Sequence, residues 1–199
     1  MINRIAFFNR LKTQNLYPKI LQHQVQGMDA ILDEWESNCN YKDLRWLAYI
    51  LATVYHETAK TMQPIEEYGK GKGLAYGGKL RMGGGPGKRV PYTTPNKIYY
   101  GRGLVQTTWY ENYEKLTKTA KAKAMGWDFL NNPEIMLQMK PSVFSAFYGM
   151  TMGIYTGKKL ADYFDGPKED WKGARKIING TDKAELIAVY GMKFLQCVE

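Results

Sequence analysis

The chain has 199 residues, a length typical of one domain with a sizeable core. Its composition, 44% hydrophobic and 24% charged, is that of a globular protein and excludes disordered and fibrous classes. The 28 Lys and Arg against 19 Asp and Glu give a net charge of +9, which favours anionic partners such as acidic wall polymers, acidic lipid or nucleic acid without naming one.

The sequence lacks the marks of a membrane or secreted protein. No apolar stretch reaches the roughly 20 residues that a spanning helix needs, and positions 1–10 do not have the pattern of a signal peptide. We therefore expect a chain made in a cytoplasm, without stable membrane insertion. We also expect it to be a monomer. In that reducing compartment Cys39 and Cys197 should be buried thiols, and a disulfide between them is the alternative.

Helical periodicity runs through most of the chain, and strand signals are scarce. The predicted helices cover 18–36, 41–58, 107–124, 142–155, 168–178 and 182–198. The second of these has two apolar faces and should be buried on most sides. Asn132-Pro133 predicts a helical turn with proline at its first position, and Asp182 with Glu185 predicts a capping box for the last helix.

A segment of different composition lies between the second and third predicted helices. Positions 69–95 hold nine glycines, three prolines and no acidic residue, and a short hairpin is predicted around 83–85. Long loops inside a domain are uncommon and often functional. We therefore predict one mainly α domain with a long Gly-rich loop.

The residues available for catalysis exclude several chemistries. The histidines are His23 and His56, and Lys60 stands where a zinc-binding helix of the His-Glu-x-x-His type has its second histidine. Because no histidine and cysteine set has metal-ligand spacing, we expect no metal and no cofactor. Arg89 follows the Gly-Lys pair at 87–88, where a phosphate loop needs Ser or Thr. A Cys–His nucleophile pair stays open.

Carboxylates are the remaining candidates for acid–base chemistry. Glu57 ends an apolar helix between His56 and Thr58, where burial disfavours the charged form, as a general acid at neutral pH requires. Glu66 and Glu67 follow a helix-breaking proline. A turn between these positions would place two acids on opposite walls of one cleft, the pair that an inverting glycoside hydrolase uses. The alternative is that all three are ordinary surface glutamates.

Short runs spread along the chain carry an ordered pattern: ATVYHETA at 52–59, TMQPIEE at 61–67, YYGRGLVQTTW at 99–109, NNPE at 131–134, GKKLADYF at 157–164 and ARKIING at 174–180. This set resembles the family 19 glycoside hydrolases, which include chitinases and lysozyme-like phage endolysins. The resemblance implies a lysozyme-like, two-lobed helical fold, a single catalytic domain over 1–199 without a separate wall-binding module, and an inverting mechanism.

The resemblance also implies roles for individual residues. Glu57 matches the general acid, and Glu67 matches the base that activates water, with Glu66 as the alternative. Thr108 matches a hydroxyl residue that helps to hold this water. The positions expected to bind substrate are Gln106, Asn112, Asn179, Tyr100 and His56, and those expected to support the carboxylates by charge are Arg102 and Arg175.

Several of these positions have a structural alternative. Hydroxyl and amide side chains suit sugar hydroxyls and acetamido groups, but Ser, Thr and Asn also cap helices near positions such as 107. Asn179 before Gly180 would equally suit the end of a helix. Aromatic side chains such as Tyr100 stack on sugars but occur more often in the core.

The substrate follows from features outside the carboxylates, because chitin and peptidoglycan share a β-1,4-linked amino-sugar backbone. The run at 61–65 is similar to the endolysin branch, and the positive charge and the lack of a secretion signal agree with it. We expect a muramidase that cuts between N-acetylmuramic acid and N-acetylglucosamine, acts on the wall after release from the cytoplasm, and causes lysis. The alternatives are a chitinase and a non-catalytic glycan- or nucleic-acid-binding module, and no nucleic-acid motif supports the last.

The segment 70–97 is strongly basic. Its cations are Lys70, Lys72, Lys79, Arg81, Lys88, Arg89 and Lys97, and it contains no acidic residue. We expect these charges to contact anionic groups of the wall or outer membrane. A solvated, flexible loop is the alternative.

Overall fold

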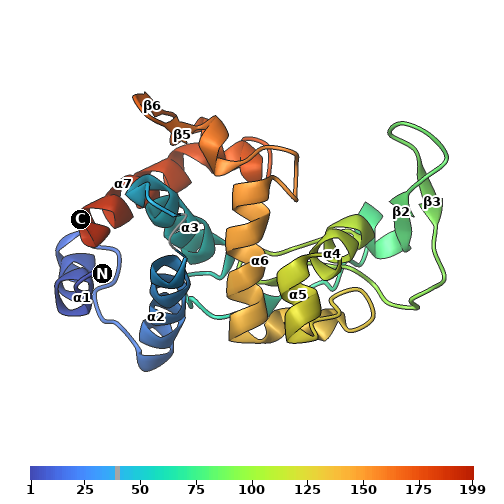
Figure 1. Ribbon diagram of the computed structural model, residues 1–199, viewed down its shortest axis with the longest axis horizontal. Coiled ribbons are helices and arrows are strands. Elements are labelled where there is room, and N and C mark those ends of the chain that lie inside the picture. Colours follow the sequence, from blue (N-terminus) through green and yellow to red (C-terminus); the bar gives the residue numbers. More distant parts are fainter. Residues whose placement is uncertain (39–40) are drawn as a thin grey trace. The chain divides into compact units, whose positions relative to one another are not determined.

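Figure 1 shows the chain as a computed structural model, which describes residues 1–38 and 41–199 and is mainly helical. The α-helices are α1 (Arg4–Thr13), α2 (Gln22–Ser37), α3 (Leu44–Glu57), α4 (Tyr110–Thr117), α5 (Ala120–Met125), α6 (Met139–Met152) and α7 (Ala184–Val198). The 3-10 helices are η1 (Ala75–Gly78), η2 (Pro133–Leu137), η3 (Leu160–Asp162) and η4 (Gly173–Ile177). The strands are β1 (Ile65–Glu66), β2 (Leu80–Met82), β3 (Arg89–Pro91), β4 (Arg102–Gly103), β5 (Phe164–Asp165) and β6 (Lys168–Glu169).

The chain forms two compact units. The first contains Met1–Gln63 and Ala146–Glu199, and the second contains Pro64–Ser145. Helix α6 runs through the boundary and returns the chain to the first unit. Two units agree with the two-lobed expectation, whereas a single catalytic domain without a wall-binding module stays a prediction.

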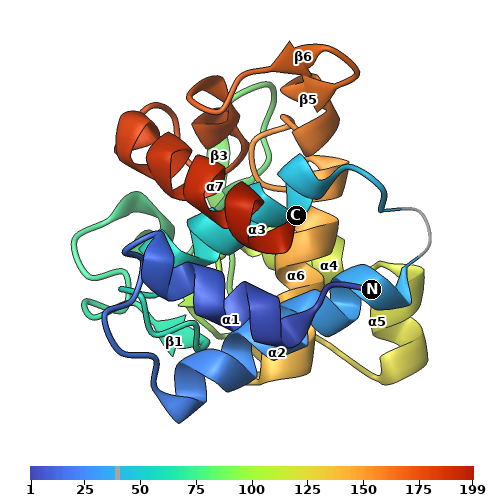
Figure 2. The same ribbon diagram turned by 90° about the vertical axis from the view of Figure 1, so that its left-hand side faces the viewer.

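Helix α3 forms the centre of the first unit. Asp43 caps it, because its carboxylate accepts a hydrogen bond from the backbone N–H of Arg45 at 3.0 Å. Every residue from Leu47 to Tyr55 is buried, which confirms the prediction from the two apolar faces. Helix α3 packs against α7, which also contacts α1 (Figure 2). This packing on several sides makes α3 a firm support for Glu57, its last residue.

The chain turns sharply directly after Glu57. Three residues of the turn have left-handed φ angles, namely Ala59 (49°), Lys60 (69°) and Met62 (55°). The carbonyl oxygen of Lys60 accepts hydrogen bonds from the Tyr17 hydroxyl at 2.8 Å and from the Gln24 amide at 3.1 Å. Side chains from before and within α2 therefore hold the backbone in a conformation that non-glycine residues rarely adopt.

The second unit consists of short elements. Strands β1 and β4 pair antiparallel, with Glu66 opposite Arg102 and Ile65 opposite Gly103. The hairpin predicted around 83–85 is confirmed by the antiparallel pair β2–β3, and α4 packs against β2. The long Gly-rich loop is therefore partly ordered into η1 and this hairpin.

The prediction of one continuous helix over 107–124 is wrong, because two separate helices, α4 and α5, lie there. Thr107 forms a β-bridge with Arg102, and α4 begins only at Tyr110. A new helix, α5, starts after Thr119, because its hydroxyl accepts a hydrogen bond from the N–H of Ala122 at 3.2 Å.

Two features of the C-terminal third also differ from the prediction. The helix predicted over 168–178 is replaced by the β5–β6 pair and by η4, which starts where Asp170 accepts a hydrogen bond from the N–H of Gly173 at 2.7 Å. The capping box is wrong, since Lys183 occupies the cap of α7 and Glu185 forms an ion pair with Lys172 at 2.5 Å. The prediction also missed α1, on which only Phe7 and Leu11 are buried.

The turn after Glu57 leads to a first prediction. A Cβ at Gly27 of α2 would lie 1.9 Å from the backbone oxygen of Met62. Gly27→Ala should therefore lower the free energy of unfolding by about 1–3 kcal/mol through overpacking, as measured by urea titration. At Gly69 a Cβ would meet nothing within 4 Å, so Gly69→Ala is the matched control. Equal stability of the two variants would contradict the described packing.

Candidate active site

The residues singled out in the sequence belong to both compact units, and each half is described by itself. The first unit holds His56, Glu57, Arg175 and Asn179. The second unit holds Glu66, Glu67, Tyr100, Arg102, Gln106, Thr108 and Asn112.

Glu57 forms an ion pair with Arg175. The Nη1 atom of Arg175 lies 2.6 Å from Oε1 of Glu57, and the two side chains are 3% and 15% exposed. The Nε atom of the same guanidinium donates to the backbone oxygen of Asp182 at 2.9 Å. The carboxyl at the end of the apolar helix therefore faces a buried cation, in agreement with the charge support that the resemblance implied for Arg175.

His56 and Asn179 are the other candidate residues of the first unit. Burial lowers the pKa of His56, and the neighbouring Glu57 opposes this effect, so the imidazole is neutral at neutral pH. Asn179 is exposed just after η4, and its backbone N–H donates to the carbonyl of Arg175 at 3.0 Å. Gly180 follows with a φ of 39°, as expected of a residue that ends a helical turn.

Glu67 is held by two uncharged donors. The hydroxyl of Tyr76 donates to Oε1 at 2.7 Å, and the backbone N–H of Gly101 donates to Oε2 at 3.0 Å. The backbone of Glu67 is fixed too, because its N–H donates to the Gly101 carbonyl at 2.7 Å. A Cβ at Gly101 would lie 2.8 Å from Oε1 of Gln106 and 3.4 Å from Cβ of Glu67, so the missing side chain leaves room for both.

Glu66 lies in a different environment. Its side chain is 40% exposed and forms an ion pair with Lys70 at 3.0 Å. The Tyr100 hydroxyl donates to its other oxygen at 2.9 Å. Two hydrogen bonds lower the pKa of Glu66, and the one from Lys70 has a larger effect than the one from Tyr100. Glu66 is therefore an exposed carboxylate that already has a cation for its partner.

Gln106, Thr108 and Asn112 lie in a tightly bonded segment. The Gln106 amide donates to the carbonyls of Ile65 at 3.0 Å and Gly103 at 3.1 Å. Asn112 is 5% exposed and donates to the carbonyl of Thr108 at 3.0 Å, so it supports the backbone. Positive φ angles at Gln106 (51°) and Trp109 (71°) flank Thr108, and strain of this kind occurs often at functional sites.

Tyr100 and Arg102 are both buried in the second unit. Tyr100 is 8% exposed, and the guanidinium carbon of Arg102 lies 3.6 Å from the centre of its ring. Arg102 donates to the carbonyl of Ile98 at 3.0 Å, and its carboxylate partner is Glu134 at 3.9 Å. The direct contacts of Arg102 are thus with Tyr100 and Glu134, while its charge is a lesser cause of the lowered pKa of Glu66. The ring of Tyr100 is covered instead of offering a face for sugar stacking.

The basic segment 70–97 has partners outside itself. Lys70 pairs with Glu66 at 3.0 Å, Arg89 with Glu111 at 2.7 Å and Lys97 with Glu134 at 4.0 Å. The sequence-based picture of a segment without counter-charges is therefore wrong for these three cations. The remaining cations are Lys72, Lys79, Arg81 and Lys88, and none has a carboxylate within ion-pair distance in the part of the chain that the structure describes.

Tyr76 and Gly101 were missed by the sequence analysis although both hold Glu67. Gly101 lies inside the run YYGRGLVQTTW, where a glycine between large residues was the available signal. Tyr76 lies among glycines and has no comparable signal. Its contact with Glu67 depends on how the loop folds.

Three solved structures, all of chitinases, are similar in fold to this chain. Chitinase C from Streptomyces griseus HUT6037 matches with a TM-score of 0.58 and 17% identity, covering 99% of this chain and 92% of that chain. A chitinase C mutant matches with a TM-score of 0.53 and 17% identity, covering 99% of this chain and 92% of that chain. A bacterial family 19 chitinase matches with a TM-score of 0.57 and 19% identity, covering 99% of this chain and 94% of that chain. The chain has the family 19 chitinase fold. The predicted mainly α, lysozyme-like fold is confirmed. No protein-family model and no curated protein matches the sequence.

The described residues contain neither a metal-ligand cluster nor a membrane-spanning helix. Among residues 1–38 and 41–199, no three His, Cys, Asp or Glu side chains cluster as metal ligands, and no helix is long and apolar enough to cross a membrane. Cys197 is buried on α7, and burial raises its pKa to about 12. Its proposed pairing with Cys39 lies outside the described residues.

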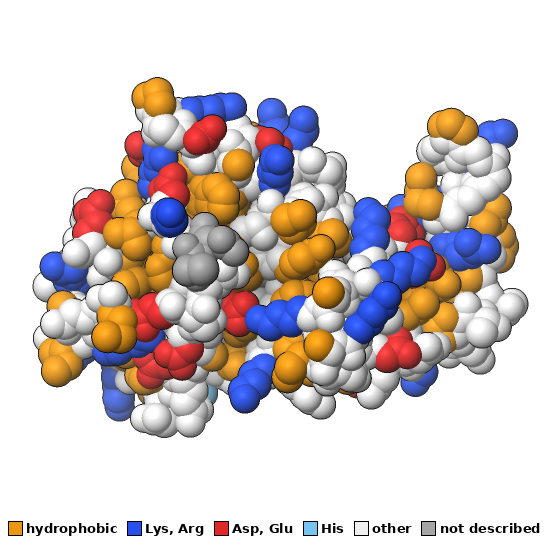
Figure 3. All heavy atoms as spheres, in the orientation of Figure 1, with side chains coloured by type: hydrophobic (Ala, Val, Ile, Leu, Met, Phe, Trp, Pro, Cys, Tyr) orange, Lys and Arg blue, Asp and Glu red, His pale blue; other side chains and the backbone are white. Residues whose placement is uncertain are grey.

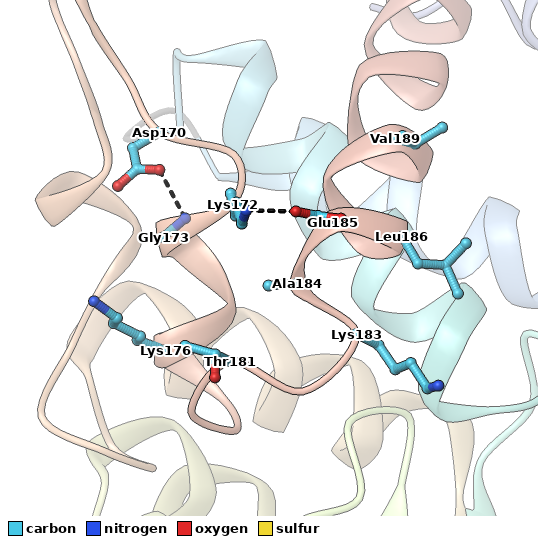
Figure 4. Close-up of a pocket in the computed structure, with 10 residues that line it drawn as sticks. All are labelled: Asp170, Lys172, Gly173, Lys176, Thr181, Lys183, Ala184, Glu185, Leu186 and Val189. Carbon is cyan, nitrogen blue, oxygen red and sulfur yellow. Dashed lines mark hydrogen bonds and ion pairs between the residues drawn. The ribbon is translucent and has the colours of Figure 1, made fainter.

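A pocket of about 840 Å³ opens in the first unit between η4 and the start of α7 (Figure 4). Ala184, Leu186 and Val189 supply its apolar lining. One side is closed by the ion pair between Lys172 and Glu185, which joins η4 to α7. None of the candidate residues lines this pocket, and no described contact indicates a ligand for it.

The ion pair of Glu57 leads to a second prediction. Arg175→Ala leaves a largely buried carboxyl without its cation, so the free energy of unfolding should fall by about 3 kcal/mol. Urea titration measures this. The control is Lys172→Ala, which breaks an ion pair whose side chains are 65% and 81% exposed and should leave the unfolding midpoint unchanged. A loss no larger than that of the control would show that the pair does not stabilise the first unit.

Proposed function

We propose that this chain is an inverting glycoside hydrolase of β-1,4-linked amino-sugar polymers, with Glu57 as general acid and Glu67 as general base. Glu57 would protonate the leaving oxygen while Glu67 activates a water on the opposite face of the sugar. The mechanism requires the two carboxyl groups to stand roughly 6.5–9.5 Å apart around the substrate, with room for that water. The observation that carries the proposal is the occurrence, on a chitinase fold, of a firmly held carboxyl group at each of these two positions.

The Arg175 guanidinium is the charged group beside Glu57 that would take part in the proposed proton transfer. When Glu57 gives its proton to the leaving oxygen, a negative charge forms beside the Arg175 guanidinium at 2.6 Å. A charged hydrogen bond to that carboxylate stabilises it as it forms. Because Asp182 holds the guanidinium from the other side, the cation is already oriented when the proton moves.

The surroundings of Glu67 favour it over Glu66 as the base. Uncharged donors hold both of its oxygens, so its geometry is fixed while its charge stays available to take a proton from water. Glu66 instead shares its charge with Lys70. Thr108, between two strained residues of the same unit, is the proposed water ligand.

Peptidoglycan is the substrate that we propose within this class, cut between N-acetylmuramic acid and N-acetylglucosamine, with chitin as the alternative. The net charge of +9 supports it, since chitin is uncharged whereas bacterial walls carry acidic groups. The endolysin-like run at 61–65 supports the same choice. On this view the protein is made in a cytoplasm and lyses cells after its release. A non-catalytic glycan-binding module would not need the two firmly held carboxyl groups.

The carboxylates give the third prediction. Glu57→Gln and Glu67→Gln should each lower the hydrolysis rate by about 10²–10⁴-fold, because each removes one partner in proton transfer. Glu66→Gln should stay within a few-fold of the parent. Turbidity loss of purified peptidoglycan and release of reducing ends from colloidal chitin measure the rates, and circular dichroism checks folding.

Mass spectrometry of the products then identifies the bond. New reducing ends at N-acetylmuramic acid indicate a muramidase, and new amino termini on the stem peptide would refute the glycosidase proposal. Full activity of Glu57→Gln would refute it as well. Activity on chitin alone would make the chain a chitinase.

The β2–β3 hairpin supports the proposed contact of segment 70–97 with an anionic wall or outer-membrane surface. Over the hairpin and helices α4 and α5, Lys and Arg side chains outnumber acidic ones on the face shown in Figure 3. Arg81 and Lys88 are exposed on this hairpin and have no carboxylate partner within the described residues. We therefore propose these two cations, together with Lys72, as the wall contact.

This contact gives the fourth prediction. Arg81→Glu with Lys88→Glu should weaken binding to cell walls several-fold and flatten its salt dependence, because two cations become anions. Sedimentation with purified walls between low and high salt measures both effects. Lys12→Glu with Lys19→Glu is the control, since both positions are exposed in the first unit and the change in net charge is equal. Equal loss in both variants would mean that only the total charge matters.

A further inference from the structure

Tyr76 is a side-chain donor to the proposed base from a segment outside every run that resembles family 19. Its hydroxyl donates to Oε1 of Glu67 at 2.7 Å. Tyr76 lies on η1, inside the Gly-rich loop, and is only partly exposed. Burial and the neighbouring Glu67 raise the pKa of Tyr76, so the hydroxyl keeps its proton and remains a donor at every working pH.

The loop places Tyr76 by folding back on itself. A Cβ at Gly77 would lie 1.9 Å from the backbone oxygen of Gly71, and Gly71 has a φ of 77°. Two backbone segments thus touch directly at a point where neither can carry a side chain. Because Tyr76 directly precedes Gly77, this backbone contact fixes the position of the Tyr76 backbone, from which the ring extends.

The ring of Tyr76 is held from the other side by Trp109. The two rings meet edge to face, with centroids 5.7 Å apart and planes at 77°. The guanidinium carbon of Arg89 lies 3.3 Å from the centre of the Trp109 ring, and Glu111 pairs with this guanidinium at 2.7 Å. The contacts therefore run without a gap from strand β3 through Trp109 and Tyr76 to Glu67.

We propose that Tyr76 is a positioning residue for the general base, and that the Gly-rich loop exists in part to deliver its hydroxyl to Glu67. The inference rests on the proposed function of Glu67. The Tyr76 hydroxyl fixes Oε1, while the backbone N–H of Gly101 fixes Oε2. Trp109 and Arg89 hold the ring in the orientation that this bond needs.

Tyr76→Phe tests the proposal, because it removes the hydroxyl and keeps the ring against Trp109. Loss of a hydrogen bond to a charged group should lower kcat by about 10- to 100-fold, with KM nearly unchanged. The rates are measured on purified peptidoglycan and colloidal chitin.

Two further variants make the test specific. Gly77→Ala keeps the hydroxyl but forces the loop apart, so it should reproduce the loss of kcat with KM nearly unchanged. Tyr99→Phe is the control. It loses a hydroxyl that donates to the carbonyl of Leu130 at 2.8 Å in the same unit, away from Glu67, so its kcat and KM should match those of the parent. Thermal melting of each variant checks folding.

The outcomes separate this inference from the proposed function. If Glu67→Gln is inactive while Tyr76→Phe keeps the kcat of the parent, the positioning role is refuted and the base remains. If Glu67→Gln is fully active, the proposed function itself fails. If Tyr99→Phe shows the same losses as Tyr76→Phe, the effect is a general one on the second unit and the inference is overturned.

Discussion

The structure depends on how it satisfies carboxyl groups that are withdrawn from water. A carboxylate that is partly buried needs hydrogen bonds or a cation, because an unpaired charge there is costly. Glu57 meets this need with Arg175, and Glu67 meets it with Tyr76 and the backbone of Gly101. The first arrangement pairs a carboxylate with a buried cation. The second fixes a carboxylate with uncharged donors, so the two groups lie in different electrostatic environments.

The parts of the fold that the sequence predicted correctly are those set by local patterns. Helix α3 has two apolar faces, and the glycines at 83–85 mark the tip of the β2–β3 hairpin, so both were predictable from spacing and turn chemistry. The incorrectly predicted elements are segments in which two local structures are equally possible. Thr119 is a helical residue by periodicity, but its hydroxyl starts a new helix, and Asp170 starts η4 after a strand pair. Periodicity contains no information on which hydrogen bond prevails.

The candidate site divides in the same way. The family-like runs located both carboxylates and Arg175, although Arg175 and Glu57 are 118 residues apart and their ion pair required the fold. The partner of Arg102 proved to be Glu134, because the side chain of Arg102 lies across the ring of Tyr100. Tyr76 could not be predicted, since its position follows from the backbone contact between Gly71 and Gly77, which depends on the path of the whole loop. Contacts of this kind leave no periodic trace in a sequence.

The Gly-rich loop combines two groups of side chains that face different demands. Tyr76, Lys70 and Arg89 make specific contacts with Glu67, Glu66 and Glu111, and these contacts hold the loop in place. Arg81 and Lys88 lie on the hairpin without such partners in the described part of the chain, so their charges remain available to solvent or to a surface. A loop that had to remain flexible for wall binding alone would not need the close approach of Gly71 to Gly77 or a guanidinium against Trp109. The glycines are therefore better explained by tight backbone packing that supports Glu67 than by flexibility.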